Sequence, residues 1–306
     1  MYIYRYVRLA GDIIVIDFKR KKAFTLIELL VVMSIIALLL SILMPALGRA
    51  RQSAMLQKDA TRIKSIHSGW ITWATSHKEK YPTPGLVNRL DFMGQSIRGK
   101  GPEDTLANTT DNVHSLSIME NLYTADLIIS DNEPNQNVFV HDDYDYDARD
   151  IQADVYWDSL LNVDLQNGGA GCNVSYASIP LIGTRKRKEW NSAGSSSFAI
   201  LSNRGPVFGE LTKFSITYDI HGGGRTWVGN VCWQDNHMSY EETVYPTLSV
   251  YKTSEGQVSD NIFGIDCVSG LCHFWGSDSW LVLVSELTPA GDMYELQLLP
   301  ELQWDD

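Results

Sequence analysis

The amino-terminal part of the chain contains one long apolar run. Residues 29–47 carry no charged side chain, and only Ser34, Ser41 and Pro45 interrupt the apolar pattern. About 20 helical residues, each rising about 1.5 Å, cross a hydrocarbon core of about 30 Å, so the length predicts a membrane-spanning helix. A buried core helix is a poor alternative, because it is seldom apolar on all sides. A cleaved secretory signal is the other alternative, but its apolar run is only about 7 to 15 residues long.

The apolar run continues into an amphipathic pattern. Apolar residues spaced by three and four stand at positions 56, 60, 63, 66, 70, 73 and 74, and basic residues stand at 58, 62 and 64. This spacing predicts a helix with one apolar face. We expect one helix from Phe24 to about Lys78, with residues 24–47 in the membrane and residues 48–80 as its amphipathic continuation. Two prolines and a glycine at positions 82, 84 and 85 end it.

Residues 81–306 are expected to form a globular head. Residues 85–112 are rich in glycine, asparagine and other polar residues and indicate a loop, and residues 113–125 indicate a short helix. Short β-rich runs separated by turn residues follow at 197–202, 214–218, 226–233, 243–251 and 280–287. The predicted fold class is therefore α+β, with a long amino-terminal transmembrane and amphipathic helix packed on a mainly antiparallel β-sheet head.

The start of the helix carries a more specific signal. Glu28 stands at the edge of the apolar run, where an ionised carboxylate costs about 2.5 to 3.5 kcal/mol and needs a partner. The string KAFTLIELLVVMSIIALLLSILMPALGRAR resembles the amino-terminal signature of type IV pilins and of the pseudopilins of type II secretion. The resemblance implies a leader, residues 1–23, that a prepilin peptidase cuts between Ala23 and Phe24 before the new amine is methylated. Ala23 stands where the family usually has glycine, and Pro45 stands where pilin helices commonly bend.

The resemblance also implies a structural function. In such assemblies the carboxylate corresponding to Glu28 meets the amine of a neighbouring subunit, and pairing relieves the cost of each isolated charge. We therefore expect a subunit of a secretion pseudopilus or pilus-like fibre whose partners are the peptidase, other pilin or pseudopilin subunits and membrane lipid. The basic residues 19–22 are expected to stay on the cytoplasmic side, and the resemblance implies a single pass through the inner membrane with a periplasmic head.

Composition and charge narrow the function classes. The chain has 306 residues, 44% of them hydrophobic and 20% charged, as in folded soluble domains. Its formal charge of -12 argues against a nucleic-acid binder, because affinity for phosphates depends on lysine and arginine. Loss of the leader removes six basic and two acidic residues and gives -16. No nucleophile elbow, HExxH motif or phosphate-binding loop occurs, so we do not expect an enzyme.

A second function class remains open. The chain could be a membrane-tethered binding or adhesin-like module that uses the leader only for delivery. Its nine Trp and fourteen Tyr residues would suit sugar stacking, although most are expected in the core.

Two clusters carry possible ligands. Asp143, Asp145 and Asp147 alternate as in a calcium loop, but Ala148 occupies the position where an EF-hand requires glycine. Because some pseudopilins bind calcium in a head loop, a looser calcium site is one interpretation, and a solvated acidic loop is the other. No other cofactor is expected.

The second cluster is the segment 221–237, which contains His221, Asp235, Asn236 and His237. It resembles a motif of pilin-like heads in which a histidine precedes a Gly-Asn-Val strand that ends in Asp-Gly-His-Val. We expect a β-hairpin with Asn236 in the left-handed turn position. Zinc bound by the two histidines and Asp235 is the alternative.

The remaining motifs are weaker. Residues 173–176 and 202–206 look like the Ser-Tyr and surface-loop elements of the same heads, and the basic run 185–188 is expected to be a solvated loop rather than a polyanion site. Four cysteines lie in the head, so one or two disulfides are expected in an oxidising compartment. Cys267 and Cys272 could close a small hairpin loop, or bind zinc together with His273.

Overall fold

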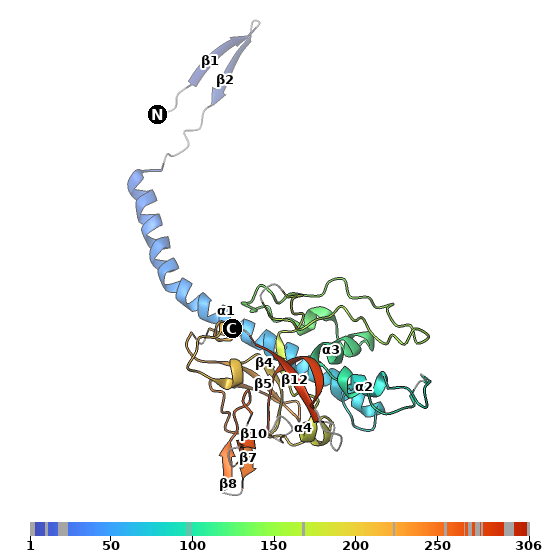
Figure 1. Cartoon of the computed structure of the whole chain (residues 1–306). Coiled ribbons are helices and arrows are strands. Elements are labelled where there is room, and N and C mark those ends of the chain that lie inside the picture. Colours follow the sequence, from blue (N-terminus) through green and yellow to red (C-terminus); the bar gives the residue numbers. More distant parts are fainter. Residues whose placement is uncertain are drawn as a thin grey trace. The chain divides into compact units, whose positions relative to one another are not determined.

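The structure is a computed structural model of the whole chain. It describes residues 4–9, 12–17, 24–95, 97, 99–166, 169–222, 224–253, 256–265, 267–268, 271–272, 276, 278–290 and 297–304, and of residues 4–9, 12–17, 251–253, 267–268, 271–272, 290 and 297–299 only the backbone. The chain divides into two compact units, residues 1–52 and 53–306. Figure 1 shows the elements of both units in chain order.

The first unit contains a hairpin and the start of the long helix. Strands β1 (Tyr4–Leu9) and β2 (Asp12–Asp17) pair antiparallel within the expected leader. Helix α1 (Leu26–Ser76) begins in this unit, includes Pro45, and ends in the second unit. The predicted single helix is therefore confirmed, because its apolar and amphipathic parts share one uninterrupted helical backbone.

The second unit is built around a four-stranded antiparallel sheet. Its strands follow one another in the order β3 (Tyr176–Ser178), β4 (Ala199–Asn203), β5 (Gly229–Trp233) and β6 (Met238–Glu241). Every residue of β3, β4 and β5 is buried, because these strands are covered on both faces. The expected α+β fold class, with a mainly antiparallel sheet, is confirmed.

Smaller elements surround this sheet. The helices are α2 (Pro84–Val87), α3 (Thr110–Met119) and α4 (Gly183–Glu189), with 3-10 turns η1 (Thr105–Ala107), η2 (Ala125–Ile128), η3 (Val207–Gly209) and η4 (Ile216–Asp219). Three two-stranded ladders pair β7 (Val250–Thr253) with β8 (Gly256–Ser259), β9 (Cys267–Val268) with β10 (Leu271–Cys272), and β11 (Leu283–Ala290) with β12 (Gln297–Gln303).

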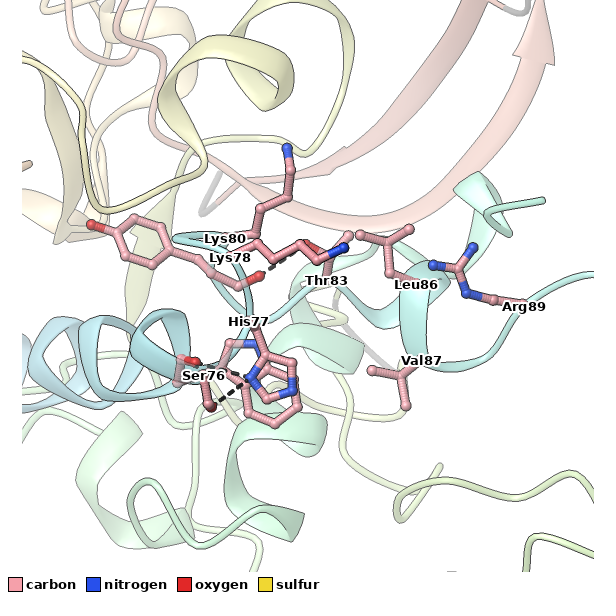
Figure 2. Close-up of a pocket in the computed structure, with 10 residues that line it drawn as sticks. Ser76, His77, Lys78, Lys80, Thr83, Leu86, Val87 and Arg89 are labelled. Atoms are coloured by element: carbon pink, nitrogen blue, oxygen red, sulfur yellow. Dashed lines mark hydrogen bonds between the residues drawn. The ribbon is translucent and has the colours of Figure 1, made fainter. Parts of the chain in front are cut away.

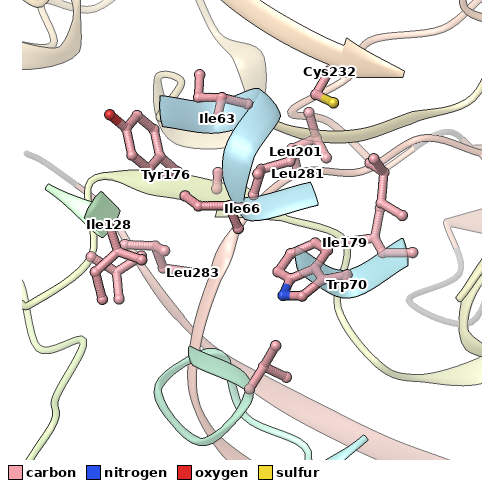
Figure 3. Packing of buried hydrophobic residues seen from close by; sticks show 14 of the residues in the cluster. Ile63, Ile66, Trp70, Ile128, Tyr176, Ile179, Leu201, Cys232, Leu281 and Leu283 are labelled. Atoms are coloured by element: carbon pink, nitrogen blue, oxygen red, sulfur yellow. The ribbon is translucent and has the colours of Figure 1, made fainter. Parts of the chain in front are cut away.

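The last turns of α1 form the centre of the head core. Ile63, Ile66 and Trp70 are completely buried, and Figure 3 shows them among side chains of the sheet and of β11. Their spacing places them on one helix face, as the sequence predicts. Burial of each such side chain contributes about 1.5 to 3 kcal/mol. The helix is therefore an integral part of the head core from residue 53 onward.

Several local predictions were wrong. Residues 214–218, expected as a strand, contain the start of η4, and most of 243–251 lies outside any strand. The short helix expected at 113–125 is α3, which ends at Met119. The run 185–188 is helical rather than a loop, and Arg185 is fully buried, where it pairs with Asp278 and lies over the Trp280 ring. A pattern of charge could not reveal the buried carboxylate that accepts this guanidinium.

The loop after α1 is tethered. Gly85 donates its N–H to Asn108 Oδ1 at 2.9 Å, and its carbonyl accepts the Asp104 N–H at 2.9 Å. A Cβ at position 85 would come within 1.8 Å of the Asp104 carbonyl oxygen, so only glycine permits this approach. Hydrogen bonds from backbone and side-chain groups therefore hold Gly85 against Asp104 and Asn108.

Two histidines are buried in this core. Nδ1 of His67 lies 3.2 Å from Asn236 Oδ1 and Nε2 lies 3.0 Å from the Tyr81 hydroxyl, while Nδ1 of His114 lies 2.9 Å from the Tyr123 hydroxyl. Burial lowers the pKa of His67 from 6.5 to about 4 and the pKa of His114 to about 3. Both side chains are therefore neutral at physiological pH.

These histidines should make the head sensitive to mild acid. Between pH 6.5 and about pH 4, the unfolded chain binds protons that folded His67 and His114 do not, so the free energy of unfolding falls as pH falls. Each histidine contributes about 1.4 kcal/mol per pH unit. Urea unfolding in detergent micelles at several pH values measures the slope, and His67→Gln should reduce it. Equal stability at pH 6.5 and pH 5 would contradict this assignment.

Candidate functional site

The first turn of α1 is closed by Thr25 and Glu28. The Thr25 N–H and hydroxyl both donate to Glu28 Oε2 at 2.9 Å, and the Glu28 N–H donates to Thr25 Oγ1 at 3.2 Å. This reciprocal pattern is a capping box, which satisfies backbone donors that no helical carbonyl reaches. Both residues are exposed in the single chain. Glu28 therefore has partners within its own chain and remains accessible to a partner from another.

The apolar run that follows is uncovered. Every side chain from residue 24 to residue 54 is exposed in the chain by itself. A stretch of 18 residues within α1 has a mean hydropathy of 2.9, and none of these residues is buried. By length and composition, the helix can therefore cross a membrane. Leaving so much apolar surface in water is unfavourable, at about 25 cal/mol for each Å². Lipid or neighbouring helices must therefore cover it.

The processing residues are only partly described. Phe24 is exposed immediately before the capping box, whereas Ala23 lies outside the described residues. Pro45 lies inside α1.

The acidic loop is ordered by a different aspartate from those expected. Asp143, Asp145 and Asp147 are exposed, whereas Asp158 is buried and accepts the Asp145 N–H at 3.0 Å and lies 3.1 Å from His141 Nε2. Among the residues that the structure describes, no group of three or more His, Cys, Asp or Glu side chains is placed to hold a metal ion. A calcium site here stays a prediction that this arrangement does not support.

The predicted hairpin is present at residues 229–241. Strands β5 and β6 pair antiparallel, and Asn236 at the tip has a φ of 66°, in the left-handed region. The Asp235 carboxylate accepts the His237 N–H at 3.1 Å and pairs with its ring, and both side chains are exposed. His221 instead points into the head, so the structure does not gather His221, Asp235 and His237 into a zinc site.

His221 belongs to a buried cluster centred on α1, the Asp59 cluster, formed by Asp59, Tyr176, Asn203 and His221. Asp59 is only 2% exposed. It accepts the Tyr176 hydroxyl at 2.5 Å and the Asn203 side-chain amide, and its Oδ2 lies 3.0 Å from His221 Nε2. Three side chains from the sheet and the loop before β5 therefore converge on one helix carboxylate.

The adjacent backbone completes this arrangement. Asn203 Oδ1 accepts the Asn230 N–H at 2.8 Å, and Asn230 Nδ2 donates to the Leu56 carbonyl at 3.1 Å. A Cβ on Gly229 would lie 2.6 Å from the Trp227 ring and 3.2 Å from the Asn203 Cβ, so glycine lets the strand approach. Asn230, in the Gly-Asn-Val part of β5, thus links the sheet to α1 one helical turn before Asp59.

The charge state of Asp59 follows from these donors. Burial raises the pKa of Asp59, but hydrogen bonds from His221, Tyr176 and Asn203 outweigh burial and hold the pKa below its ordinary value of 3.8. Burial also raises the pKa of Tyr176 well above its usual range, so its hydroxyl stays protonated as a donor. Asp59 is therefore an ionised carboxylate held inside the head by directed donors.

The hairpin tip makes a second contact with α1. Asn236 Nδ2 donates to Ser68 Oγ at 2.8 Å, and Asn236 Oδ1 lies 3.2 Å from His67 Nδ1. Neutral His67 can donate from Nδ1 to Asn236 and accept at Nε2 from Tyr81, which satisfies both ring nitrogens. The two ends of the 221–237 segment therefore bind the helix at Asp59 and at His67 with Ser68.

Asp59 is the site residue that sequence analysis missed. A charge at this position lies four residues before Ile63 and three after Leu56, on the apolar face of the helix. An acidic residue on the apolar face is the signal that could have predicted a buried partner. The expectation of a surface loop at 202–206 was wrong, because all five residues are buried and Asn203 faces Asp59.

The cysteines divide into two groups. Cys172 and Cys232 are both buried, and burial raises the pKa of Cys232, so the Cys232 thiol is expected to be unreactive. Cys267 and Cys272 are direct backbone partners across the β9–β10 ladder. Their side chains lie outside the described residues, and the disulfide stays a prediction.

Replacing Asp59 by asparagine should destabilise the head. In Asp59→Asn, the N–H groups of the new amide face side chains that donate hydrogen bonds to the carboxylate of Asp59. We therefore expect a loss of about 1.5 to 3 kcal/mol in the free energy of unfolding. Asp219→Asn, an exposed neighbour of His221, is the matched control and should be neutral. Because the Asp59 pKa is lowered, its contribution is complete above pH 3.8 and disappears as pH falls below that value. Urea denaturation of both variants at neutral pH measures the difference; equal midpoints would contradict the cluster's role.

Comparisons with known proteins identify the amino-terminal segment. Residues 18–44 match the family described as the prokaryotic N-terminal methylation motif. No curated protein and no solved structure matches the chain. The matched residues include Phe24, the Thr25–Glu28 capping box and most of the exposed apolar run. The amino-terminal segment of this membrane-anchored, single-pass chain therefore carries a type IV pilin-like signature.

Proposed function

We propose that the chain is a pseudopilin-like structural subunit of a type II secretion pseudopilus or pilus-like fibre. One observation carries the proposal: the segment that matches the methylation motif contains the start of an apolar helix, and none of the described residues covers this part of the helix. Lipid covers such a helix before assembly, and helices of neighbouring subunits replace the lipid contacts in the fibre. The subunit lies in the inner membrane with its head in the periplasm.

Glu28 supplies the register in this proposal. Cleavage before Phe24 creates an amine four residues ahead of Glu28, and the carboxylate of one subunit pairs with the amine of the next. The capping box supports this role, because it holds the carboxylate at the first turn of the helix, where an incoming amine reaches it. In apolar surroundings the pair stabilises two charges that would each be costly alone.

The amino terminus tests the processing step. Mass spectrometry of the chain purified from cells with a prepilin peptidase should show a chain that begins with methylated Phe24. The alanine at position 23 keeps a small side chain before the cut. A chain that retains residues 1–23 under these conditions would overturn processing at this bond.

Two substitutions separate pairing from helix capping. Glu28→Gln keeps a capping-box residue and removes the charge, whereas Thr25→Ala keeps the charge and removes the cap. We expect Glu28→Gln to insert normally but to lose assembly, because removal of one partner of a buried ion pair costs about 3 to 5 kcal/mol. Thr25→Ala should assemble.

Crosslinking measures the outcome. With a cysteine introduced at the exposed Ser41, assembled subunits should give a crosslinked dimer in membranes. Equal dimer yields from Glu28→Gln and the parent would refute the pairing role. Loss of the dimer from both Glu28→Gln and Thr25→Ala would assign Glu28 to helix capping instead. Absence of a crosslinked dimer from the parent would favour a tethered module over a fibre subunit.

A further inference from the structure

A basic cavity opens in the head where α1 ends. It measures about 470 Å³, within the range of small-molecule sites, and lies between the last turn of α1 and α2. Figure 2 shows its lining, with Leu86 and Val87 on α2 and the long side chains of Lys78, Lys80 and Arg89 around it. We call it the basic cavity.

The charge of the basic cavity is opposite to that of the chain. The chain carries a formal charge of -12, yet none of the described residues that line the cavity is acidic. Among the described residues, no carboxylate forms an ion pair with Lys78 or Lys80. Cations gathered in a cleft focus the local field and attract an anion.

A neighbouring hollow extends the positive surface. It measures about 140 Å³, shares Lys80 and Leu86 with the basic cavity, and adds Lys186 and Arg187. Glu103 pairs with Lys186 there. Burial lowers the pKa of Lys186, the charge of Glu103 raises it, and the charge of Lys80 lowers it again. The carboxylate of Glu103 therefore faces several lysine and arginine side chains. A bound anion would relieve the repulsion that remains between these positive charges.

The backbone holds the two lysines in place. Lys78 and Glu79 have φ values of 54° and 62°, in the left-handed region that is unfavourable for residues with side chains. The Glu79 N–H donates to the Ala74 carbonyl at 3.0 Å, and the Glu79 carbonyl accepts the Ser192 N–H at 2.8 Å. The turn that carries Lys78 and Lys80 is therefore fixed at both sides, which sets the backbone positions from which the two lysine side chains extend.

The cavity also has an aromatic wall. The imidazole of His77 lies parallel to the indole of Trp73, with ring centroids 3.6 Å apart and an interplanar angle of 0°. Leu86 and Val87 add aliphatic surface. A bare inorganic anion needs no such wall, whereas a sugar ring buries its C–H face against aromatic and aliphatic side chains.

We propose that the basic cavity binds an acidic saccharide, with a ring carboxylate held by Lys78, Lys80 and Arg89 and the ring face packed against the stacked pair of His77 and Trp73. A saccharide in which acidic and neutral rings alternate fits best, because its sparse charge limits long-range repulsion from the acidic chain. Charge-assisted hydrogen bonds from lysine and arginine supply specificity for the carboxylate. This inference is independent of the proposed assembly through α1.

Calorimetric titration of the full chain tests the proposal. The chain is kept in micelles of a detergent without a sugar headgroup, and the probe is a hexasaccharide of alternating glucuronate and N-acetylglucosamine. We expect the hexasaccharide to bind. Its carboxyl-reduced form should bind at least about tenfold more weakly, since loss of one charge-assisted hydrogen bond raises the dissociation constant by a factor of about ten or more.

Matched variants locate the site. Lys80→Gln should weaken binding about tenfold, and Lys64→Gln, which removes an exposed charge of α1 outside the cavity, should leave it unchanged. Trp73→Leu should weaken the binding of the hexasaccharide but not the binding of inorganic phosphate.

Four results would overturn the proposal. They are no binding of the hexasaccharide, equal binding of its carboxyl-reduced form, equal losses in Lys80→Gln and Lys64→Gln, and displacement by inorganic phosphate or a nucleoside monophosphate at similar concentrations. The last result would assign the cavity to phosphate chemistry.

Discussion

A carboxylate removed from water must be given hydrogen-bond donors, and this constraint organises the head of the protein. Asp59 lies on the apolar face of α1, and the side chains of Tyr176, Asn203 and His221 converge on it. These donors come from β3, β4 and the loop before β5. The helix and the sheet can therefore pack closely only in the register that brings all three donors to Asp59. Apolar contacts alone would tolerate small shifts of the helix along the sheet.

Glu28 also needs hydrogen-bond donors or a positive partner when it leaves water, but its own chain supplies only part of them. Glu28 has a partner in Thr25, which caps the helix, but no part of the chain that the structure describes covers the apolar surface around it. In the assembly that we propose, a neighbouring subunit supplies both the apolar cover and the positive charge. One helix thus carries two acidic side chains, the first exposed in the single chain and the second satisfied inside the head.

The segment 221–237 has a structural explanation without any metal or catalytic chemistry. Its first residue, His221, reaches Asp59, and Asn236 at the hairpin tip reaches His67 and Ser68. The intervening strand β5 contributes Asn230, which binds the Leu56 carbonyl. The segment therefore attaches the hairpin to α1 at three points, and the left-handed conformation of Asn236 is part of this attachment. Polar side chains that suggested a ligand site from their spacing instead satisfy one another and the helix.

Short-range patterns were sufficient to determine the long helix, the apolar run, the turn at Asn236 and the hairpin, because periodicity and turn chemistry act between residues close in the chain. The α+β class followed from the same patterns. Tertiary structure alone decided that Arg185 is buried against Asp278, that residues 202–206 are internal, and that Lys80 and Arg89 line one cavity. It also decided that Asp59 meets His221, 162 residues away in the chain. These outcomes depend on which distant groups meet in space, and the energy of a buried charge is set by such neighbours rather than by its position in the sequence.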